Sequence, residues 1–188
     1  MSTNLGITAG IDEAGRGPLA GPVVAAACIL PKLKRIPKFI CDSKILTPED
    51  REEAYQWIQR YCVSGVGLSG SRVVDNFGIL AATERAMQQA VHMLAQSTKP
   101  TYLLVDGRDK FWLDYPHSSI IDGDALEPCI SAASIVAKVT RDHMMRKAEE
   151  MFPGYGFAQH KGYGTEMHYA MLRKLGMCAI HRRSYLKM

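Results

Sequence analysis

A pair of neighbouring acids followed at once by a glycine-rich turn constrains this chain more than any other feature. Residues 10–18 read Gly-Ile-Asp-Glu-Ala-Gly-Arg-Gly-Pro, so Asp12 and Glu13 end an apolar run, and a second strand-like run follows over Val23–Leu30. Two strands joined by so short a connection pair antiparallel. A carboxylate at the end of a core strand is costly unless a metal ion or a cation pairs with it. The opening residues therefore predict two paired strands that carry a charged site.

The patterns along the rest of the chain predict an α/β fold with a mixed β-sheet flanked by helices. Further strand-like runs lie at 63–68, 102–105 and 119–121, and helical patterns at 47–61, 79–95, 128–150 and 165–175. A helix separates the runs at 63–68 and 102–105, which fits a parallel crossover. We expect one domain over residues 1–188, with a loop and a helical part from about residue 151.

Composition limits the classes of function. The net charge is only +4, from 23 basic and 19 acidic residues, which permits a nucleic-acid partner without arguing for one. The five cysteines form no Cys-x-x-Cys pair, a pattern typical of reduced thiols in a cytoplasmic protein and not of a zinc site or a disulfide framework. The sequence shows neither a signal-peptide pattern nor an apolar run of membrane-spanning length, so we expect no membrane association.

Two further acids follow strand-like runs. Asp106 comes directly after the run at 102–105, and Asp124 follows the stretch at 119–121. With Asp12 and Glu13, acids then end three predicted strands, and we expect them to share one site. Successive side chains of a strand point to opposite faces, so we expect the first strand to break at Glu13 and let both acids face that site.

Hard divalent cations suit a cluster of four carboxylates. The acids would repel one another and any phosphate, and Mg²⁺ or Mn²⁺ relieves both repulsions because these ions take oxygen ligands and bridge phosphate oxygens. Two such ions can clamp the attacking and leaving oxygens of an in-line displacement. The pattern therefore indicates a metal-dependent enzyme acting on a phosphate ester.

Three alternatives compete with this interpretation. The glycines at 15 and 17 satisfy a relaxed dinucleotide-binding fingerprint, but that motif needs a helix directly after them, where Val23–Leu30 reads as a strand. A structural calcium site lacks the EF-hand spacing and leaves the Gly-Arg-Gly turn without a role. A different nuclease or recombinase with an acidic metal site stays open on these residues alone.

Six blocks in order resemble one family, ribonuclease HII, over most of the chain. They are residues 10–18, Asp42-Ser43-Lys44, Leu104-Val105-Asp106-Gly107, Gly123-Asp124, residues 131–142 (Ser-Ala-Ala-Ser-Ile-Val-Ala-Lys-Val-Thr-Arg-Asp) and residues 160–165 (His-Lys-Gly-Tyr-Gly-Thr). The resemblance implies a ribonuclease H-like fold and an endonuclease that cuts the RNA strand of RNA–DNA hybrids. It also implies incision 5′ of a single ribonucleotide in duplex DNA, leaving 3′-hydroxyl and 5′-phosphate ends, and a monomer. We see no tail of the kind with which some relatives bind a sliding clamp.

The resemblance also implies roles for individual residues. The metal ligands and catalytic acids would be Asp12, Glu13, Asp106 and Asp124. Gly15, Arg16 and Gly17 would read the ribose 2′-hydroxyl, and Tyr163 would pack on the sugar of the next nucleotide.

Other polar residues offer further contacts. We expect Ser43 and Lys44 to contact a phosphate, and His160 and His181, beside basic residues, to be able to meet one. Asp142 stays outside the metal set, because an acid in the middle of a helix more often pairs with a neighbouring Lys or Arg.

Overall fold

The computed structural model describes residues 6–32, 35–40, 43 and 45–186, and its centre is a five-stranded mixed sheet. The strands are β1 (Thr8–Ala14), β2 (Val23–Ile29), β3 (Val63–Ser69), β4 (Tyr102–Asp106) and β5 (His117–Ile120). The helices are α1 (Pro48–Tyr61), α2 (Ser71–Ser97), α3 (Gly123–Leu126), α4 (Pro128–Met151), α5 (Phe157–His160) and α6 (Glu166–Leu175), with a 3₁₀ turn η1 (Arg183–Tyr185). The predicted fold class is therefore confirmed.

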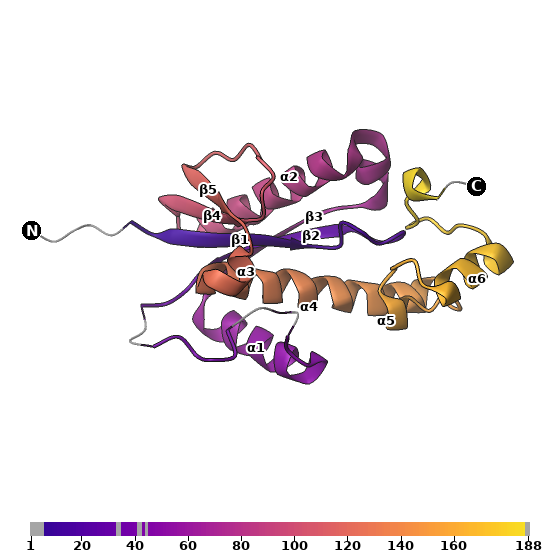
Figure 1. Cartoon of the computed structure of the whole chain (residues 1–188), viewed down its shortest axis with the longest axis horizontal. Coiled ribbons are helices and arrows are strands. Elements are labelled where there is room, and N and C mark those ends of the chain that lie inside the picture. Colours follow the sequence, from indigo (N-terminus) through magenta and orange to yellow (C-terminus); the bar gives the residue numbers. More distant parts are fainter. Residues whose placement is uncertain (1–5, 33–34, 41–42, 44, 187–188) are drawn as a thin grey trace, which may run out of the picture.

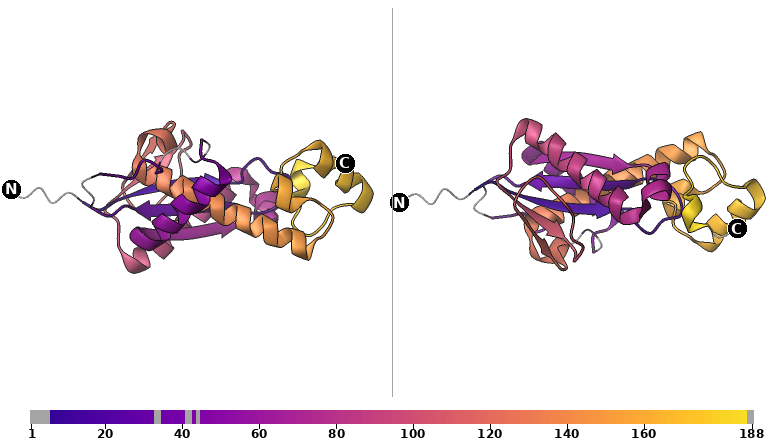
Figure 2. Two further views of the ribbon diagram at one scale, coloured as in Figure 1. Left: turned by 90° about the horizontal axis from the view of Figure 1, so that it is seen from below. Right: turned by 90° about the horizontal axis from the view of Figure 1, so that it is seen from above.

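The strand order is β3-β2-β1-β4-β5. β2 pairs antiparallel with β1 and with β3, whereas β4 pairs parallel with β1 and with β5. The predicted antiparallel pairing of the first two strands is thus confirmed. β3 and β4 run in the same direction, as a crossover requires. Two strands, β2 and β1, lie between them in the sheet, so α2 passes over both on its way from β3 to β4 (Figure 2).

The helices form a layer on each face of the sheet (Figure 1). On one face Met87 and Leu94 of α2 pack against Ile11 and Leu103. On the other face the core holds side chains of α4 and α1, such as Ile135. Each strand of the sheet centre is therefore buried on both sides, which explains the long apolar runs in the sequence.

Close contact between α4 and β1 depends on Gly10. A Cβ at this position would lie 2.2 Å from the main-chain carbonyl carbon of Cys129, at the start of α4. The absence of a side chain lets the first turns of α4 lie directly on β1, two residues before Asp12. The rest of that helix then runs under the strand end where the acids lie.

The predicted helix starts are confirmed where a cap specifies them. The Thr47 hydroxyl accepts a hydrogen bond from the Asp50 N–H at 3.1 Å at the start of α1, and Thr165 caps α6 in the same way. α2 begins eight residues before the predicted position 79, at Ser71, and bends at Gly78, where φ is +81°. The predicted loop before α6 contains the short helix α5.

The part of the chain after α4 packs around the far end of that helix (Figure 1). Its small core includes Phe157, Tyr155 and Met145. One isolated bridge joins His181 to Ala20, so this part also contacts the connection between β1 and β2. Among the described residues no helix is long and apolar enough to cross a membrane, and the described cysteines (28, 62, 129 and 178) are free thiols.

Candidate active site

One pocket of about 360 Å³ collects the predicted site residues. Its lining includes Asp12, Glu13, Gly15, Arg16, Gly17, Ser43, Asp106, Asp124 and Tyr163. These residues come from β1, the turn after it, the segment before α1, β4, α3 and the segment after α5. Lys44, the remaining predicted residue, lies outside the described residues, as does Asp42.

The first strand does not break at Glu13, contrary to expectation. β1 continues to Ala14, and Glu13 pairs in register with Ala25 of β2. The parallel pairing of β1 with β4 ends at Ile11 and Val105, so the last residues of β1 have a strand on one side only. Asp12 and Glu13 point to opposite faces of the sheet, but both border this open edge and line the same pocket.

Asp124 reaches the pocket from a helix and not from a strand end, which corrects the prediction that it ends a strand. β5 stops at Ile120, and Asp124 lies in the short helix α3. Its main-chain N–H donates a hydrogen bond to Oδ1 of Asp106 at 3.1 Å. This bond joins the end of β4 to α3 and brings the two acids to one side of the pocket.

Burial and neighbouring acids act together on Asp12. This side chain is 5% exposed, and its burial and then the charges of Glu13 and Asp106 raise its pKa well above the usual value. Burial likewise raises the pKa of Glu13 despite the nearby Arg16. The two acids thus lie in a site that disfavours their charged forms unless a further cation joins them.

A short chain of hydroxyls supports Asp12. A hydrogen bond from Ser134 favours its charged form, as does the Glu13 N–H, which donates to Oδ1 of Asp12 at 2.7 Å. Ser134 and Ser43 join through their hydroxyl oxygens at 2.9 Å. The Ser43 hydroxyl, which also lines the pocket, is therefore already engaged with a side chain of the protein.

The four acids line one pocket, but their carboxylates are not close enough to one another to form a metal site. Within the described part of the chain, no three His, Cys, Asp or Glu side chains are close enough to hold a metal ion as they stand. The site in this structure is a set of carboxylates around a common volume, and any ion between them requires their side chains to turn inward.

The turn after β1 is held from within by a residue that sequence reasoning missed. Arg182, fully buried, donates to the carbonyl oxygens of Gly15 at 2.6 Å, Arg16 at 2.8 Å and Gly21 at 2.9 and 3.1 Å. The Tyr185 hydroxyl adds a 3.0 Å bond to the carbonyl of Arg16. In the sequence Arg182 lies among other basic residues (Arg173, Lys174, Arg183 and Lys187), a pattern typical of a solvated surface, and no local signal shows that its partners lie in the first turn.

Gly15 is required by both conformation and space. Its φ is +96°, a region that side chains disfavour, and a Cβ there would lie 2.1 Å from Nε of Arg141. Arg141, another buried arginine, donates to the carbonyls of Pro22 at 3.0 Å and Ala20 at 3.1 Å. At Gly17 the nearest atom to an added Cβ is Cε1 of Tyr163 at 3.9 Å, so this glycine faces open space.

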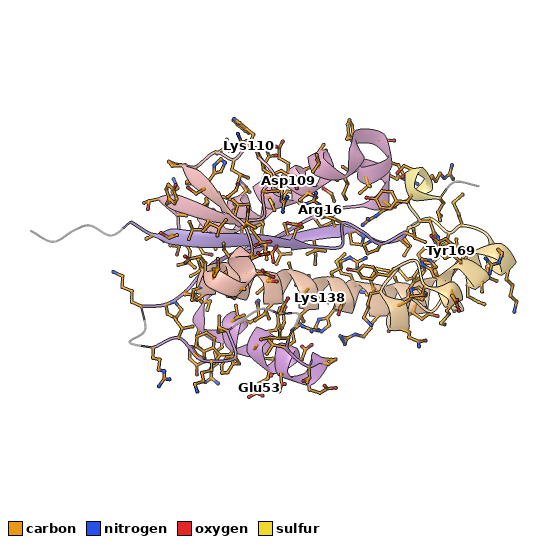
Figure 3. All side chains as sticks on the ribbon, viewed as in Figure 1. Arg16, Glu53, Asp109, Lys110, Lys138 and Tyr169 are labelled. Carbon is orange, nitrogen blue, oxygen red and sulfur yellow. The ribbon has the colours of Figure 1, made fainter. Side chains whose placement is uncertain are left out.

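Arg16 points toward acids of its own chain. Its Nη1 lies 2.8 Å from Asp109 and 3.4 Å from Glu13. Figure 3 shows Arg16 and Asp109 next to each other on the α2 side of the sheet, with Lys138 on the α4 side. The guanidinium is about one third exposed, so it can still be reached from the pocket.

Tyr163 meets the turn across more than 140 residues of sequence. The ring is 45% exposed, and the Arg141 guanidinium carbon lies 5.8 Å from its centre. The Leu19 N–H donates to the carbonyl of Gly162 at 2.8 Å, which ties the tyrosine segment to the connection after the turn. The structure therefore places the tyrosine and the glycine turn at the same side of the pocket.

Three weaker predictions are settled by contacts. Asp142 pairs with Lys138 at 2.9 Å, as expected for an acid within a helix. The expectation that His160 and His181 meet phosphate is wrong, because both are buried and both ring nitrogens of each ring have partners inside the protein. Neither residue lines the pocket.

Comparisons with known proteins agree with this geometry. The family model for ribonuclease HII matches residues 9–188. Ribonuclease HII of Geotalea uraniireducens (strain Rf4) is 52% identical over 178 residues, which is 94% of this chain and 81% of the relative.

Solved structures support the fold independently. In the complex of PCNA with RNase HII from Archaeoglobus fulgidus, the matched chain has a TM-score of 0.82 at 24% identity, with 97% of this chain and 96% of that chain covered. Bst-RNase HIII in complex with Mn²⁺ gives a TM-score of 0.68 at 20% identity, covering 92% of this chain and 64% of that chain.

The strand that follows the glycine turn, where a dinucleotide-binding motif needs a helix, removes that alternative. Within the ribonuclease H fold, the match of the family model over nearly the whole chain and the close identity to curated relatives decide the assignment. The chain belongs to the ribonuclease HII family, endonucleases that cut the RNA strand of RNA–DNA hybrids.

Proposed function

We propose that this enzyme also incises duplex DNA on the 5′ side of a single embedded ribonucleotide, leaving 3′-hydroxyl and 5′-phosphate ends, with divalent cations held by Asp12, Glu13, Asp106 and Asp124. One observation carries the proposal. The four acids line the same pocket as the Gly15–Gly17 turn and Tyr163, so groups suited to a phosphate and groups suited to a sugar face one volume.

The donor set fits a hard divalent cation. Every acidic side chain of the pocket offers oxygen, and no histidine or cysteine is among its described lining residues. Oxygen-only sites suit Mg²⁺ and Mn²⁺. Burial and the charges of Glu13 and Asp106 raise the pKa of Asp12, and a bound cation would stabilise its charged form. Two bound ions would supply an activated water and stabilise the charge on the attacking and leaving oxygens.

The protein's own residues divide the remaining tasks. The Asp124 N–H holds Asp106 in place, and the bonds from Ser134 and the Glu13 N–H fix Asp12. We therefore expect Asp12 and Asp106 to border the pocket before substrate binds, and the acids to turn toward an ion when one enters. Ser43 and Lys44 stay predicted phosphate contacts, of which Ser43 would first have to release Ser134.

The turn and the tyrosine are suited to testing one ribose. Only the 2′-hydroxyl distinguishes RNA from DNA at a single nucleotide, and it both donates and accepts hydrogen bonds. Gly17 leaves space where a side chain would intrude, and Tyr163 closes that space from the other side with an exposed ring. A sugar bound there would touch main chain on one side and an aromatic face on the other.

The deciding experiment is cleavage of a labelled DNA duplex that carries one ribonucleotide, in Mg²⁺, in Mn²⁺ and in chelator. We expect a metal-dependent cut 5′ of the ribonucleotide, with a product whose 3′ end is extended by a polymerase. Tyr163→Ala should lose this cleavage more than cleavage of a continuous RNA–DNA hybrid. If the duplex with one ribonucleotide stayed intact while a continuous RNA–DNA hybrid was cut, the nuclease activity would be retained and the proposed recognition of a single ribose would be refuted.

A further inference from the structure

Three histidines that take no part in the pocket form a buried cluster behind Tyr163. His168 and His181 meet through their Nε2 atoms at 3.0 Å, and the ring of His160 stacks on that of His168 with centres 4.4 Å apart. All three are at most 9% exposed and pack against Phe157. Buried polar groups of this kind are costly unless every one is bonded.

The partners of these rings fix which nitrogen carries each proton. The Cys178 N–H lies 2.9 Å from Nδ1 of His181, and a main-chain amide can only donate, so this Nδ1 accepts and Nε2 carries the proton. Nε2 of His168 must then accept from His181. Nδ1 of His168 is left to donate to the carbonyl oxygen of Tyr163 at 2.9 Å.

The hydrogen bonds therefore run in one direction, from the Cys178 amide through His181 and His168 to the Tyr163 carbonyl. A proton added to His168 would set two N–H donors against each other at the 3.0 Å contact. A proton added to Nδ1 of His181 would oppose the Cys178 N–H at 2.9 Å. Burial opposes such a proton, because it lowers the pKa of His168 and lowers that of His181 to about 4. His160 fits the same neutral arrangement, since it accepts from the Gly162 N–H at 3.1 Å and bonds the Tyr155 carbonyl at 2.8 Å.

This series of hydrogen bonds ends at the Tyr163 carbonyl, in a segment whose backbone conformation is unusual. Lys161 and Gly162, just before Tyr163, have φ values of +53° and +83°, and the tyrosine itself is exposed. His181 braces this segment through His168, while the next residue, Arg182, braces the glycine turn. The adjacent residues His181 and Arg182 thus hold both walls of the proposed sugar site.

We propose that His168 and His181 are positioning residues that hold Tyr163 against the substrate sugar through a proton-ordered pair of neutral imidazoles. This inference rests on the role of Tyr163 proposed above. It assigns the histidines no contact with substrate. It predicts that they control discrimination at a single ribonucleotide more than cleavage itself.

Paired variants of His168 test the role. His168→Phe keeps a ring of similar size but removes both hydrogen bonds, and we expect cleavage at a single ribonucleotide to fall about tenfold more than cleavage of a continuous hybrid, as for one lost hydrogen bond. His168→Asn places an amide N–H where Nδ1 lies and should restore most of that selectivity. His92→Phe, on the exposed face of α2, is the matched control and should leave the ratio unchanged.

Tyr163→Ala in the same assay separates this inference from the function on which it rests. If Tyr163→Ala loses both substrates equally, the proposed reading by Tyr163 fails whatever the histidines do. If Tyr163→Ala is selective while His168→Phe loses both equally, or neither, the positioning role is overturned.

A spectroscopic measurement on the unchanged protein holds even if His168→Phe does not fold. Long-range proton–nitrogen NMR at pH 7 should show the proton on Nδ1 of His168 and on Nε2 of His181. The opposite arrangement, or a doubly protonated ring, would overturn the proposal.

Discussion

Replacing Arg182 with methionine should cost the protein several kcal/mol, although no acidic side chain among the described residues forms an ion pair with this arginine. Its guanidinium donates to the carbonyls of Gly15, Arg16 and Gly21 from a fully buried position. Methionine fills much of the same volume but donates nothing, so three carbonyls lose a charged donor.

The magnitude follows from two opposing effects. The Arg16 carbonyl keeps its bond from the Tyr185 hydroxyl, which leaves the carbonyls of Gly15 and Gly21. Each unsatisfied buried carbonyl costs about 1–3 kcal/mol, or roughly 2–6 kcal/mol for these two. Burial of the guanidinium, which lowers the pKa of Arg182, costs several kcal/mol that the substitution recovers in part. We therefore expect a net loss of about 2–4 kcal/mol in the free energy of unfolding.

Urea denaturation of Arg182→Met measures this loss, and Arg183→Met is the matched control. Arg183 is the next residue and is exposed, and its bond to Asp75 comes from the main-chain N–H, which the substitution keeps. The control should stay within about 0.5 kcal/mol of the wild type. A loss below about 1 kcal/mol for Arg182→Met, or one equal to the control, would refute the idea that this side chain braces the turn.

Three further predictions concern the pocket. Asp12→Asn should abolish cleavage yet stabilise the metal-free protein at pH 8 by about 1 kcal/mol. The reason is that a protein with a carboxyl of raised folded pKa becomes less stable as the pH rises through that pKa. Thermal melts in chelator at pH 5 and 8 check this, and an equal Tm difference at both pH values would contradict it. Asp124→Asn should reduce cleavage by about a thousandfold or more, as expected when a metal ligand is lost. Binding of the hybrid, measured by fluorescence anisotropy, should change by less than about threefold. Near-normal cleavage would remove Asp124 from the proposed metal set. Gly15→Ala should lower the free energy of unfolding by about 2–4 kcal/mol, because Gly15 has a φ of +96° and an added Cβ would lie 2.1 Å from Arg141. Gly17→Ala should change that free energy by less than about 0.5 kcal/mol and lower only cleavage at a single ribonucleotide. Similar losses of stability for both variants would contradict this distinction between the two glycines.

The layered fold was predictable because local patterns specify it. The Thr47 cap, the apolar runs of β1 and β2 and the start of α4 at Pro128 all read directly from neighbouring residues. The continuation of β1 through Glu13 was not predictable, since the strand is kept by pairing with β2 and not by its own composition. The short helix α3 was missed for a similar reason, because four residues carry no periodic pattern.

The candidate site shows the same division. The acids and the glycine turn stand out because charge and glycine are unusual after an apolar strand. The supports behind them do not: Arg182 lies among basic residues and His168 in a predicted helix, and neither pattern shows that the side chain is buried. Sequence reasoning therefore found the groups that would face the substrate and missed those that hold them in place.

The bond between Arg182 and Gly15 also sets an order of events during synthesis. The two residues are 167 positions apart, so the turn emerges from the ribosome long before its brace exists. At about 5–20 residues per second, translation of the intervening chain takes roughly 10–30 s. During that interval the nascent protein already contains Asp12 and Glu13 but has no fixed turn beside them. The nuclease gains its braced sugar-binding wall only when the last part of the fold docks.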